Sequence, residues 1–167
     1  AMPIITFPAA TKLNISVKKL INDTDQQVAA LKIIKEECNP LAILGFMDLS
    51  VEAECFGAEI KVTDNEVPTV VGQLIEDEDD AQALKVPAVG SGRSQLYIDA
   101  IKKTKAEIKD IPILGGCIGP FSLAGRLMDV SEAMINCYEE PEMVHIVLEK
   151  ATKFLICLLY TSPSPRD

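Results

Sequence analysis

The sequence predicts an α/β protein in which parallel strands alternate with helices. Short, continuous apolar runs such as Leu41–Met47 and Ile111–Leu114 are separated by amphipathic helical segments. Such runs are typical of strands that helices cover on both faces. The 167 residues, of which 48% are hydrophobic, are enough to bury the core of one globular domain.

The N-terminal third is predicted to hold one strand and two helices. Met2–Phe7 is apolar and short, as expected for a strand. Ile15–Ile21 has a short helical pattern, and Gln26–Cys38 has a clearer one. Thr24 or Asp25 is the expected N-cap, because a side-chain oxygen there can accept from a free backbone N–H. The apolar stripe of this helix consists of Val28, Leu31, Ile33 and Ile34.

A buried strand, a helix and a second strand are expected next. Leu41–Met47 is the strand, and Asp48 stands at its carboxyl end. A short helix then runs through Cys55 and ends at Gly57. Ala58–Val62 has the length and the β-branched residues of another strand.

The middle of the chain is less regular. Val67–Leu74 is expected to be extended, and the acidic run Glu76–Asp80 to begin a short helix. We interpret the run as a solvated helix N-terminus rather than a metal site, since no other ligands converge on it. The loop Pro87–Gly92 precedes an amphipathic helix, Arg93–Lys109. Its inward-facing residues are predicted to be Leu96, Ile98, Ile101 and Ile108.

The stretch Ile111–Val130 is the part around which the rest is organised. A buried strand leads into Gly115-Gly116-Cys117-Ile118-Gly119, and Pro120 opens a helix. Glycines allow a ligand to approach the backbone, and free N–H groups at the start of the helix favour an anion. This stretch is therefore either a substrate floor or an ordinary tight connection between a strand and a helix; local sequence leaves both open.

The C-terminal part is predicted to be helical and then to change character. Helices are expected at Ser131–Tyr138 and from Pro141 onward. Residues 157–167, CLLYTSPSPRD, resemble the conceptual translation of a sequencing adapter. We therefore expect a native segment of residues 1–156 followed by an artefactual tail, residues 157–167, in which Ser162–Asp167 packs on nothing.

Composition restricts the classes of function. The net charge of −9 and a pI near 4.7 argue against a nucleic-acid surface. No apolar run is long enough to span a membrane, and no signal peptide is visible. The odd number of cysteines, without CxxC spacing, indicates reduced thiols rather than disulfides or a zinc site. We therefore expect a cytoplasmic protein that acts on a small molecule.

The number of strands leaves two architectures open. Three or four strands are too few for an eight-stranded barrel of about 250 residues. A complete chain would form an open three-layer domain, and an incomplete one the N-terminal half of a (β/α)8 barrel. In both, ligands bind at the carboxyl ends of the strands, so Pro8, Asp48 and Gly115–Gly119 should share one face.

Each candidate site residue also has a structural interpretation. Asp48 either caps the helix at Ser50 or faces a ligand. Ser122 suits the first turn of a helix better than a nucleophile, because no base is placed beside it. Arg126 either pairs with a neighbouring carboxylate, Asp129 or Glu132, or reaches the pocket. Cys117 lines the pocket or fills a small buried space.

Three further titratable residues, Glu52, Glu54 and His145, also have structural interpretations. Glu52 and Glu54 lie two positions apart and cannot share a helix face, so one of them is predicted to be solvated. His145 lies on a helix between acidic residues. We do not expect it to bind a metal or a ligand.

Two long motifs resemble one known family. FMDLSVEAECFGAEI (Phe46–Ile60) and GGCIGPFSLAGRLMDV (Gly115–Val130) are similar to segments of the uroporphyrinogen decarboxylase superfamily. The second contains that family's G-x-x-G-P-[FW]-[ST]-L pattern, and PEMVHIVLEKATKF fits the helix that follows. The superfamily includes cobalamin-dependent and corrinoid-protein:coenzyme M methyltransferases. The resemblance covers about the N-terminal half of a member and implies half of a (β/α)8 barrel.

The motifs favour the methyltransferase branch. Decarboxylases carry an arginine-rich MRQAGRY segment that holds substrate carboxylates, whereas Phe7–Leu13 contains no arginine. They also carry a tyrosine where this chain has Arg126. Asp48 is the counterpart of the aspartate that contacts pyrrole N–H groups, and methyltransferases share the run Asp48–Glu54.

The resemblance implies methyl transfer between a methyl-corrinoid protein and a thiol acceptor. Such enzymes activate the thiol with zinc, whose ligands (a His-x-Cys pair and a distal Cys) are expected beyond this segment, so no metal ligand is predicted here. Uroporphyrinogen III decarboxylation and a non-catalytic fragment are the alternatives, and the oligomeric state stays open. Asp48 is the predicted catalytic residue. The predicted substrate-binding residues are Pro8, Gly116, Cys117, Gly119, Ser122 and Arg126.

Overall fold

Short helices begin the described part of the chain. The computed structural model describes residue 2 and residues 7–161, so the predicted strand Met2–Phe7 lies mostly outside the described residues. Helix α1 (Pro8–Leu13) begins with a proline in its first turn. In α2 (Val17–Ile21), the N-cap Ser16 accepts from the backbone N–H of Lys19. The predicted pattern at Ile15–Ile21 therefore forms its helix, whereas α1 was not expected.

Helix α3 (Thr24–Cys38) begins two residues before the predicted start. Its N-cap is Asp23, whose Oδ1 accepts from the N–H groups of Asp25 and Gln26 at 2.9 and 3.2 Å. The predicted cap, Thr24 or Asp25, is therefore wrong by one or two positions. The predicted stripe does face the core: Val28, Leu31 and Ile34 are buried, and Ile33 is half-buried.

The two apolar runs form the parallel pair that their sequence predicts. Strand β1 (Ile43–Leu44) pairs with β4 (Ile113–Leu114), with Ile43 opposite Ile113. The paired segments are shorter than the apolar runs. Of the segments between them, α4 (Val51–Cys55) and α6 (Ser94–Glu107) lie close to the predicted positions.

The strand predicted at Ala58–Val62 does not pair with the two parallel strands. β2 (Glu59–Lys61) and β3 (Thr69–Val71) form an antiparallel hairpin apart from the β1–β4 pair. A parallel partner needs a crossover of a dozen or more residues, whereas a short loop joins antiparallel strands. The segment Ala58–Val62 is therefore a strand, but it does not extend the parallel pair among the described residues.

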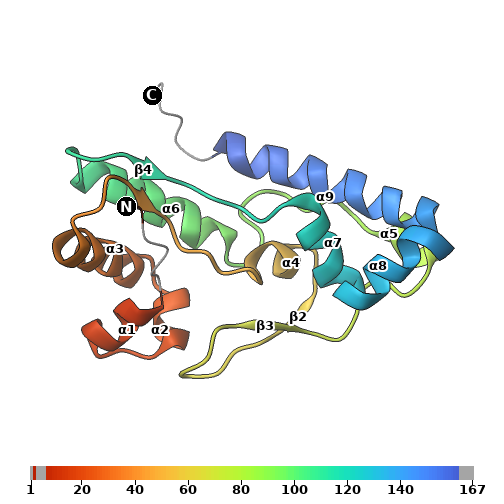
Figure 1. Ribbon diagram of the computed structural model, residues 1–167, viewed down its shortest axis with the longest axis horizontal. Coiled ribbons are helices and arrows are strands. Elements are labelled where there is room, and N and C mark those ends of the chain that lie inside the picture. Colours follow the sequence, from red (N-terminus) through yellow and green to blue (C-terminus); the bar gives the residue numbers. More distant parts are fainter. Residues whose placement is uncertain (1, 3–6, 162–167) are drawn as a thin grey trace.

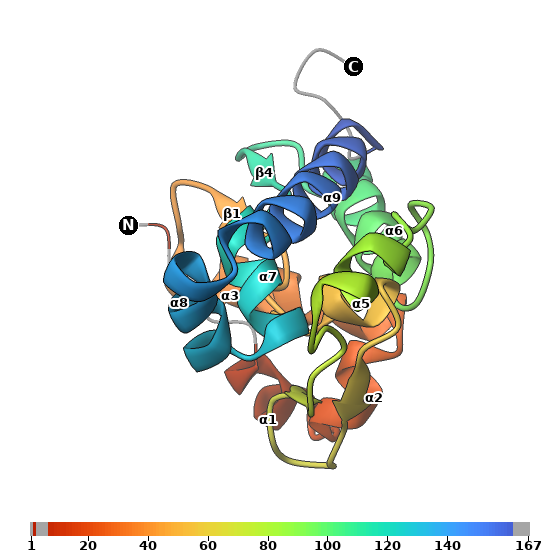
Figure 2. The same ribbon diagram turned by 90° about the vertical axis from the view of Figure 1, so that its right-hand side faces the viewer.

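Four further helices pack with α4 around one cluster of buried residues. α5 (Glu78–Ala83) is capped by Asp77 within the acidic run, as expected for a solvated helix N-terminus. α7 (Pro120–Met128), α8 (Val130–Glu139) and α9 (Pro141–Thr161) follow the glycine-rich loop. α9 contacts α5, α7 and α8 and lies along one edge of the molecule (Figures 1 and 2). It continues past Ile156, and Leu158 is buried; residues 162–167 lie outside the described part.

The buried residues form two clusters. One joins α1–α3 to β1 and to Ile108, and the other joins α4–α9. The β1–α4 and β4–α7 connections run between them (Figure 1). The architecture is a mixed α/β arrangement in which loops following parallel strands meet where two cores adjoin. Within residues 7–161, every helix is too short or too polar to cross a membrane.

Candidate functional site

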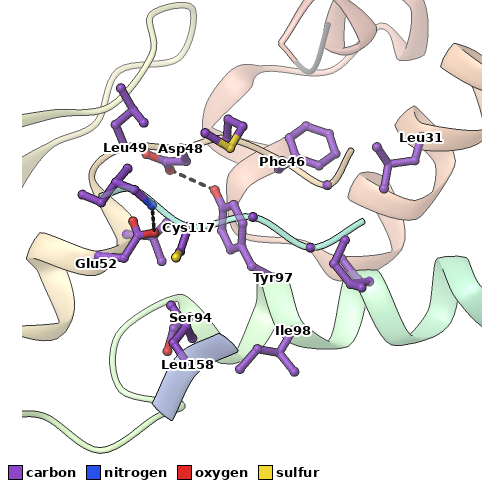
Figure 3. A pocket seen from close by; sticks show the side chains of 18 residues that line it. Leu31, Phe46, Asp48, Leu49, Glu52, Ser94, Tyr97, Ile98, Cys117 and Leu158 are labelled. Atoms are coloured by element: carbon purple, nitrogen blue, oxygen red, sulfur yellow. Dashed lines mark hydrogen bonds between the residues drawn. The ribbon is translucent and has the colours of Figure 1, made fainter. Parts of the chain in front are cut away.

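A cavity lies at the junction of the two cores, at the carboxyl ends of β1 and β4. Its volume is about 50 Å³, and it opens to solvent on one side. Polar groups reach it from the β1–α4 loop, from α4 and from α6, and the segment Gly115–Ile118 forms another side (Figure 3). The apolar wall includes Leu31, Phe46, Ile98, Ile101, Ile118 and Leu158. This is where ligands bind in α/β proteins.

Asp48 is fully paired within the protein. Its Oδ1 accepts from the backbone N–H and the hydroxyl of Ser50, at 3.0 and 2.6 Å. Its Oδ2 accepts from Nη1 of Arg93 at 2.5 Å and from the hydroxyl of Tyr97 at 2.8 Å (Figure 3). A carboxylate has about four acceptor positions, so described residues occupy its full capacity. Asp48 therefore turns the chain into α4 through Ser50 and also lines the cavity, and its contact with a ligand stays a prediction.

Arg93 holds this cluster together. Besides Asp48, its Nε donates to Oε2 of Glu54 at 2.6 Å and its Nη2 to Oγ of Ser50 at 2.9 Å. The planar guanidinium suits such forked pairing better than a lysine would. Gly92 precedes it with φ +53°, and a Cβ there would lie 3.3 Å from Cγ of Glu54. The glycine lets the loop enter α6 close to α4, so that Arg93 reaches three partners.

Charge and burial shift the pKa values of Arg93 and Tyr97. Burial lowers the pKa of Arg93, but the charge of Asp48 and its hydrogen bond more than offset this, so that the pKa is raised. Burial, with the negative charge of Asp48, raises the pKa of Tyr97 well beyond its usual range. Arg93 therefore stays charged and Tyr97 stays protonated, as hydrogen-bond donors to Asp48. The sequence does not indicate a role for Arg93 or Tyr97, because only the fold brings α6 beside Asp48.

Glu52 is buried, contrary to what its spacing from Glu54 suggested. Only 5% of Glu52 is exposed, and Glu54 is half-buried in its ion pair with Arg93. The prediction that one of them is solvated is therefore wrong. The helix α4 is short and enclosed, so that Val51, Glu52 and Ala53 are buried in succession.

The Glu52 carboxyl has one paired oxygen and one unpaired oxygen. Oε1 accepts from the backbone N–H of Ile118 at 3.1 Å (Figure 3). Oε2 is buried and has no hydrogen-bond partner among the described residues. Burial, with a smaller contribution from Asp48, raises the pKa of Glu52, against opposing effects of the Ile118 N–H and Arg126.

Three of the predicted site residues line the cavity. Asp48 does so from the β1–α4 loop, and Gly116 and Cys117 from the β4–α7 loop. Cys117 is half-buried and its thiol is free. Burial, and then the charge of Glu52, raise the pKa of Cys117, so it is not activated as a nucleophile.

The other predicted residues lie elsewhere. Pro8 starts α1, while Gly119 and Ser122 are exposed at the start of α7, and none of the three lines the cavity. Arg126 is half-buried on α7 and also outside the lining; its Nε is buried and unpaired among the described residues. The expected pairing of Arg126 with Asp129 or Glu132 is not among the ion pairs of residues 7–161. Substrate contacts by these residues stay predictions.

Metal ligands do not converge in the described part. Within residues 7–161, no three histidine, cysteine, aspartate or glutamate side chains gather as a metal ion requires. His145 is exposed on α9. These residues therefore do not fit a zinc site.

The relatives of the chain fall into two enzyme groups. It is 39% identical over 82 residues to methylcobamide:CoM methyltransferase MtbA of Methanosarcina acetivorans, an alignment that covers 48% of this chain and 24% of that protein. It is 30% identical over 132 residues to uroporphyrinogen decarboxylase of Campylobacter concisus, covering 70% and 38%. The alignments therefore span well under half the length of these relatives.

A solved structure and a family model agree with these relatives. A methyltransferase from Methanosarcina mazei superposes with a TM-score of 0.82 at 21% identity, covering 95% of this chain and 49% of that one. At that identity the likeness shows the fold. The family model for uroporphyrinogen decarboxylase (URO-D) matches residues 3–161. The chain therefore belongs to the uroporphyrinogen decarboxylase family.

Proposed function

We propose that the chain is part of a methyltransferase that moves a methyl group from a methyl-corrinoid protein to a thiol acceptor. In the reaction, a sulfur–carbon bond forms as the carbon–cobalt bond breaks, and the electron pair of that bond stays with the corrinoid. The thiol loses its proton before the attack, because the thiolate is the nucleophile. Together with the remaining part of the protein, the chain would complete a (β/α)8 barrel.

The pairing of Asp48 is the observation that carries this proposal. A decarboxylase of the family needs its aspartate free to accept hydrogen bonds from pyrrole N–H groups. Here Ser50, Arg93 and Tyr97 already fill the acceptor positions of Asp48. In the proposed methyltransferase, Asp48 holds Tyr97 at the cavity wall and keeps Arg93 in place behind it.

The region before α3 also supports methyl transfer over decarboxylation. A substrate with several carboxylates needs cations to pair with them. Phe7–Leu13 lacks arginine, and its lysine, Lys12, is paired with Glu37 at 3.0 Å. Ala9 and Ala10 of α1 are buried against the core.

Zinc and the corrinoid belong to other parts of the proposed assembly. Zinc, when bound, lowers the pKa of a coordinated thiol. Because the described residues do not fit a zinc site, we expect its ligands beyond them, with a His-x-Cys pair and one further Cys. Metal analysis of the 167-residue chain should accordingly find no stoichiometric zinc, and finding it would contradict this assignment.

The test uses the full-length protein, assayed with methylcobalamin as donor and coenzyme M as acceptor. We expect formation of the methylated thiol, loss of activity with a chelator, and its return with zinc. Asp48→Asn should reduce turnover and leave zinc bound, because it disturbs the cavity wall and no metal ligand. A complete protein that lacks those ligands and converts uroporphyrinogen to coproporphyrinogen would establish the decarboxylase alternative instead.

A further inference from the structure

Most polar side chains that line the cavity already have partners within the protein. Asp48 accepts from Ser50, Arg93 and Tyr97, and the Tyr97 hydroxyl is used in donating to it. Oγ of Ser94 donates to the carbonyl of Ser91 at 2.7 Å and accepts from the N–H of Gly90 at 3.1 Å. Among the oxygens of these lining side chains, Oε2 of Glu52 is the one left without a hydrogen bond among the described residues.

Such an atom is costly unless something pairs with it. A buried polar group without a partner costs about 1–3 kcal/mol, and an ionised carboxylate costs more. Glu52 is 95% buried, and the protein fixes only its Oε1, through Ile118 on the cavity-lining loop. Glu52 therefore lines the cavity with one carboxyl oxygen, Oε2, that no described residue pairs.

We propose that Glu52 is the ligand-binding residue of this cavity, and that it acts as a neutral carboxylic acid whose Oε2–H donates to an acceptor atom of an uncharged ligand group. The family resemblance did not assign this role to Glu52. The proposal concerns binding at the cavity, and it stands whether the complete protein transfers methyl groups or removes carboxylates.

Burial, rather than the surrounding charges, is the main effect that favours the neutral form of Glu52. On the β1–α4 side, Asp48 is negative and raises the pKa of Glu52, although Arg93 neutralises much of its charge. Glu54, on the same helix, is also bound to Arg93. From α7, Arg126 lowers the pKa of Glu52, but no ion pair joins the two side chains among the described residues. Burial is the largest effect and raises the pKa.

The chemistry of the cavity selects the class of ligand. Its wall is mostly apolar, and its other carboxylate is already matched by a cation. A cation would find no unpaired carboxylate in the lining while Glu52 is protonated, and an anion would find no lysine or arginine there. A small apolar group that carries a neutral acceptor oxygen or sulfur satisfies both the wall and Oε2.

The protonation state can be measured on the 167-residue chain without substitution. In protein labelled with ¹³C-glutamate, the side-chain carboxyl carbon of Glu52 should titrate at higher pH than those of the exposed residues Glu59 and Glu66. A Glu52 carboxyl that titrates together with these two would overturn the neutral-acid assignment.

Binding is tested with two probes of similar size. Dimethyl sulfoxide is a neutral acceptor without a donor, and isopropylammonium is a cationic donor without an acceptor. Below the pKa of Glu52, dimethyl sulfoxide should shift the Ile118 amide and Glu52 carboxyl signals saturably, and isopropylammonium should not. Stronger binding of the cation, or no saturable shift with either probe, would overturn the proposal.

Two substitutions of Glu52 distinguish the effect of its hydrogen-bond donor from the effect of its side-chain shape. Glu52→Gln keeps an N–H donor and should retain the response to dimethyl sulfoxide. Glu52→Leu keeps similar bulk without a donor and should lose it. Glu59→Gln, on the exposed face of β2, is the matched control and should change nothing. Equal responses of the Gln and Leu variants would show that Oε2 does not contact the ligand.

Discussion

At the scale of single residues, the site depends on how buried charges are matched. Arg93 and Asp48 are both buried, with side-chain exposures of 8% and 0%. Removing one partner from such a pair leaves the other charged and unpaired, which costs far more than breaking an exposed pair. Removing Arg93 also takes a hydrogen bond from Ser50 and Glu54, and removing Asp48 takes one from Ser50 and Tyr97.

Arg93→Met should accordingly lower the free energy of unfolding by about 3–5 kcal/mol. The matched control is Lys12→Met, which removes a cation from the exposed pair with Glu37 and should cost no more than about 1 kcal/mol. Urea unfolding followed by circular dichroism measures both. Equal losses in the two variants would contradict the assigned importance of the buried cluster.

The raised pKa of Glu52 leads to a second prediction, that the free energy of unfolding depends on pH. Because the folded-state pKa lies above the unfolded-state value, the folded protein holds the Glu52 proton more tightly. The resulting stabilisation is complete below the unfolded-state pKa and is lost as pH rises through the folded-state pKa. Glu52→Gln removes this dependence, so its stability relative to the wild type should increase as pH rises through that window. Urea unfolding across the pH range tests this, and a constant difference between the two proteins would refute it.

At the scale of elements, the approach of β1 to α6 requires a residue without a side chain. Gly45 follows β1, and a Cβ there would overlap Cδ1 of Ile101 and lie 3.5 Å from the carbonyl oxygen of Leu114. Ile101 also lines the cavity. Gly45 therefore determines how closely α6, and with it Arg93 and Tyr97, approaches the strand.

Gly45→Ala should destabilise the protein by about 1–3 kcal/mol through overpacking. Ile101→Val removes the overlapping methyl group and alone should cost about 0.5–1.5 kcal/mol. The double variant should be more stable than the sum of the two losses predicts, because the smaller side chain makes room for the new methyl group. Strict additivity in thermal or urea unfolding would show that the overlap is relieved elsewhere.

At the scale of the whole molecule, α9 has one buried face and one open face. Phe154, Leu155 and Leu158 are buried, whereas Ile156 is 49% and Leu159 51% exposed. Leu159 and Tyr160 lie three and four residues after Ile156, so all three lie on one side of the helix. Figure 1 shows this helix along one edge of the molecule. A contiguous apolar face of this kind promotes association.

The double variant Ile156→Lys and Leu159→Lys should therefore lower the self-association of the 167-residue chain. Leu41→Lys is the control, since Leu41 is 76% exposed at a different place and should have less effect. Sedimentation velocity at increasing protein concentration measures the difference. A greater effect of the Leu41 variant would contradict the role given to α9.

The sequence by itself determined most of the helices, the parallel strand pair and the family. Periodicity located α3, α6 and α7–α9, because an amphipathic stripe follows directly from the order of residues. The apolar runs at Ile43 and Ile113 indicated buried strands; the structure pairs them in parallel, but Ile113 is only half-buried and Leu114 is exposed. The motifs Phe46–Ile60 and Gly115–Val130 indicated the family whose model matches residues 3–161. Asp48, Gly116 and Cys117 were identified because residues after parallel strands meet at one edge.

Only the tertiary structure decided which residues act on one another. Arg93 is 45 positions from Asp48, and Tyr97 is 49, so no local pattern could have indicated their hydrogen bonds. The burial of Glu52 depends on the Ile118 loop, 66 positions away. Spacing along a helix predicts which residues share a face, but the neighbours of each face are set by packing between distant segments. For that reason the sequence identified the cavity floor, and the fold identified the buried charges around it.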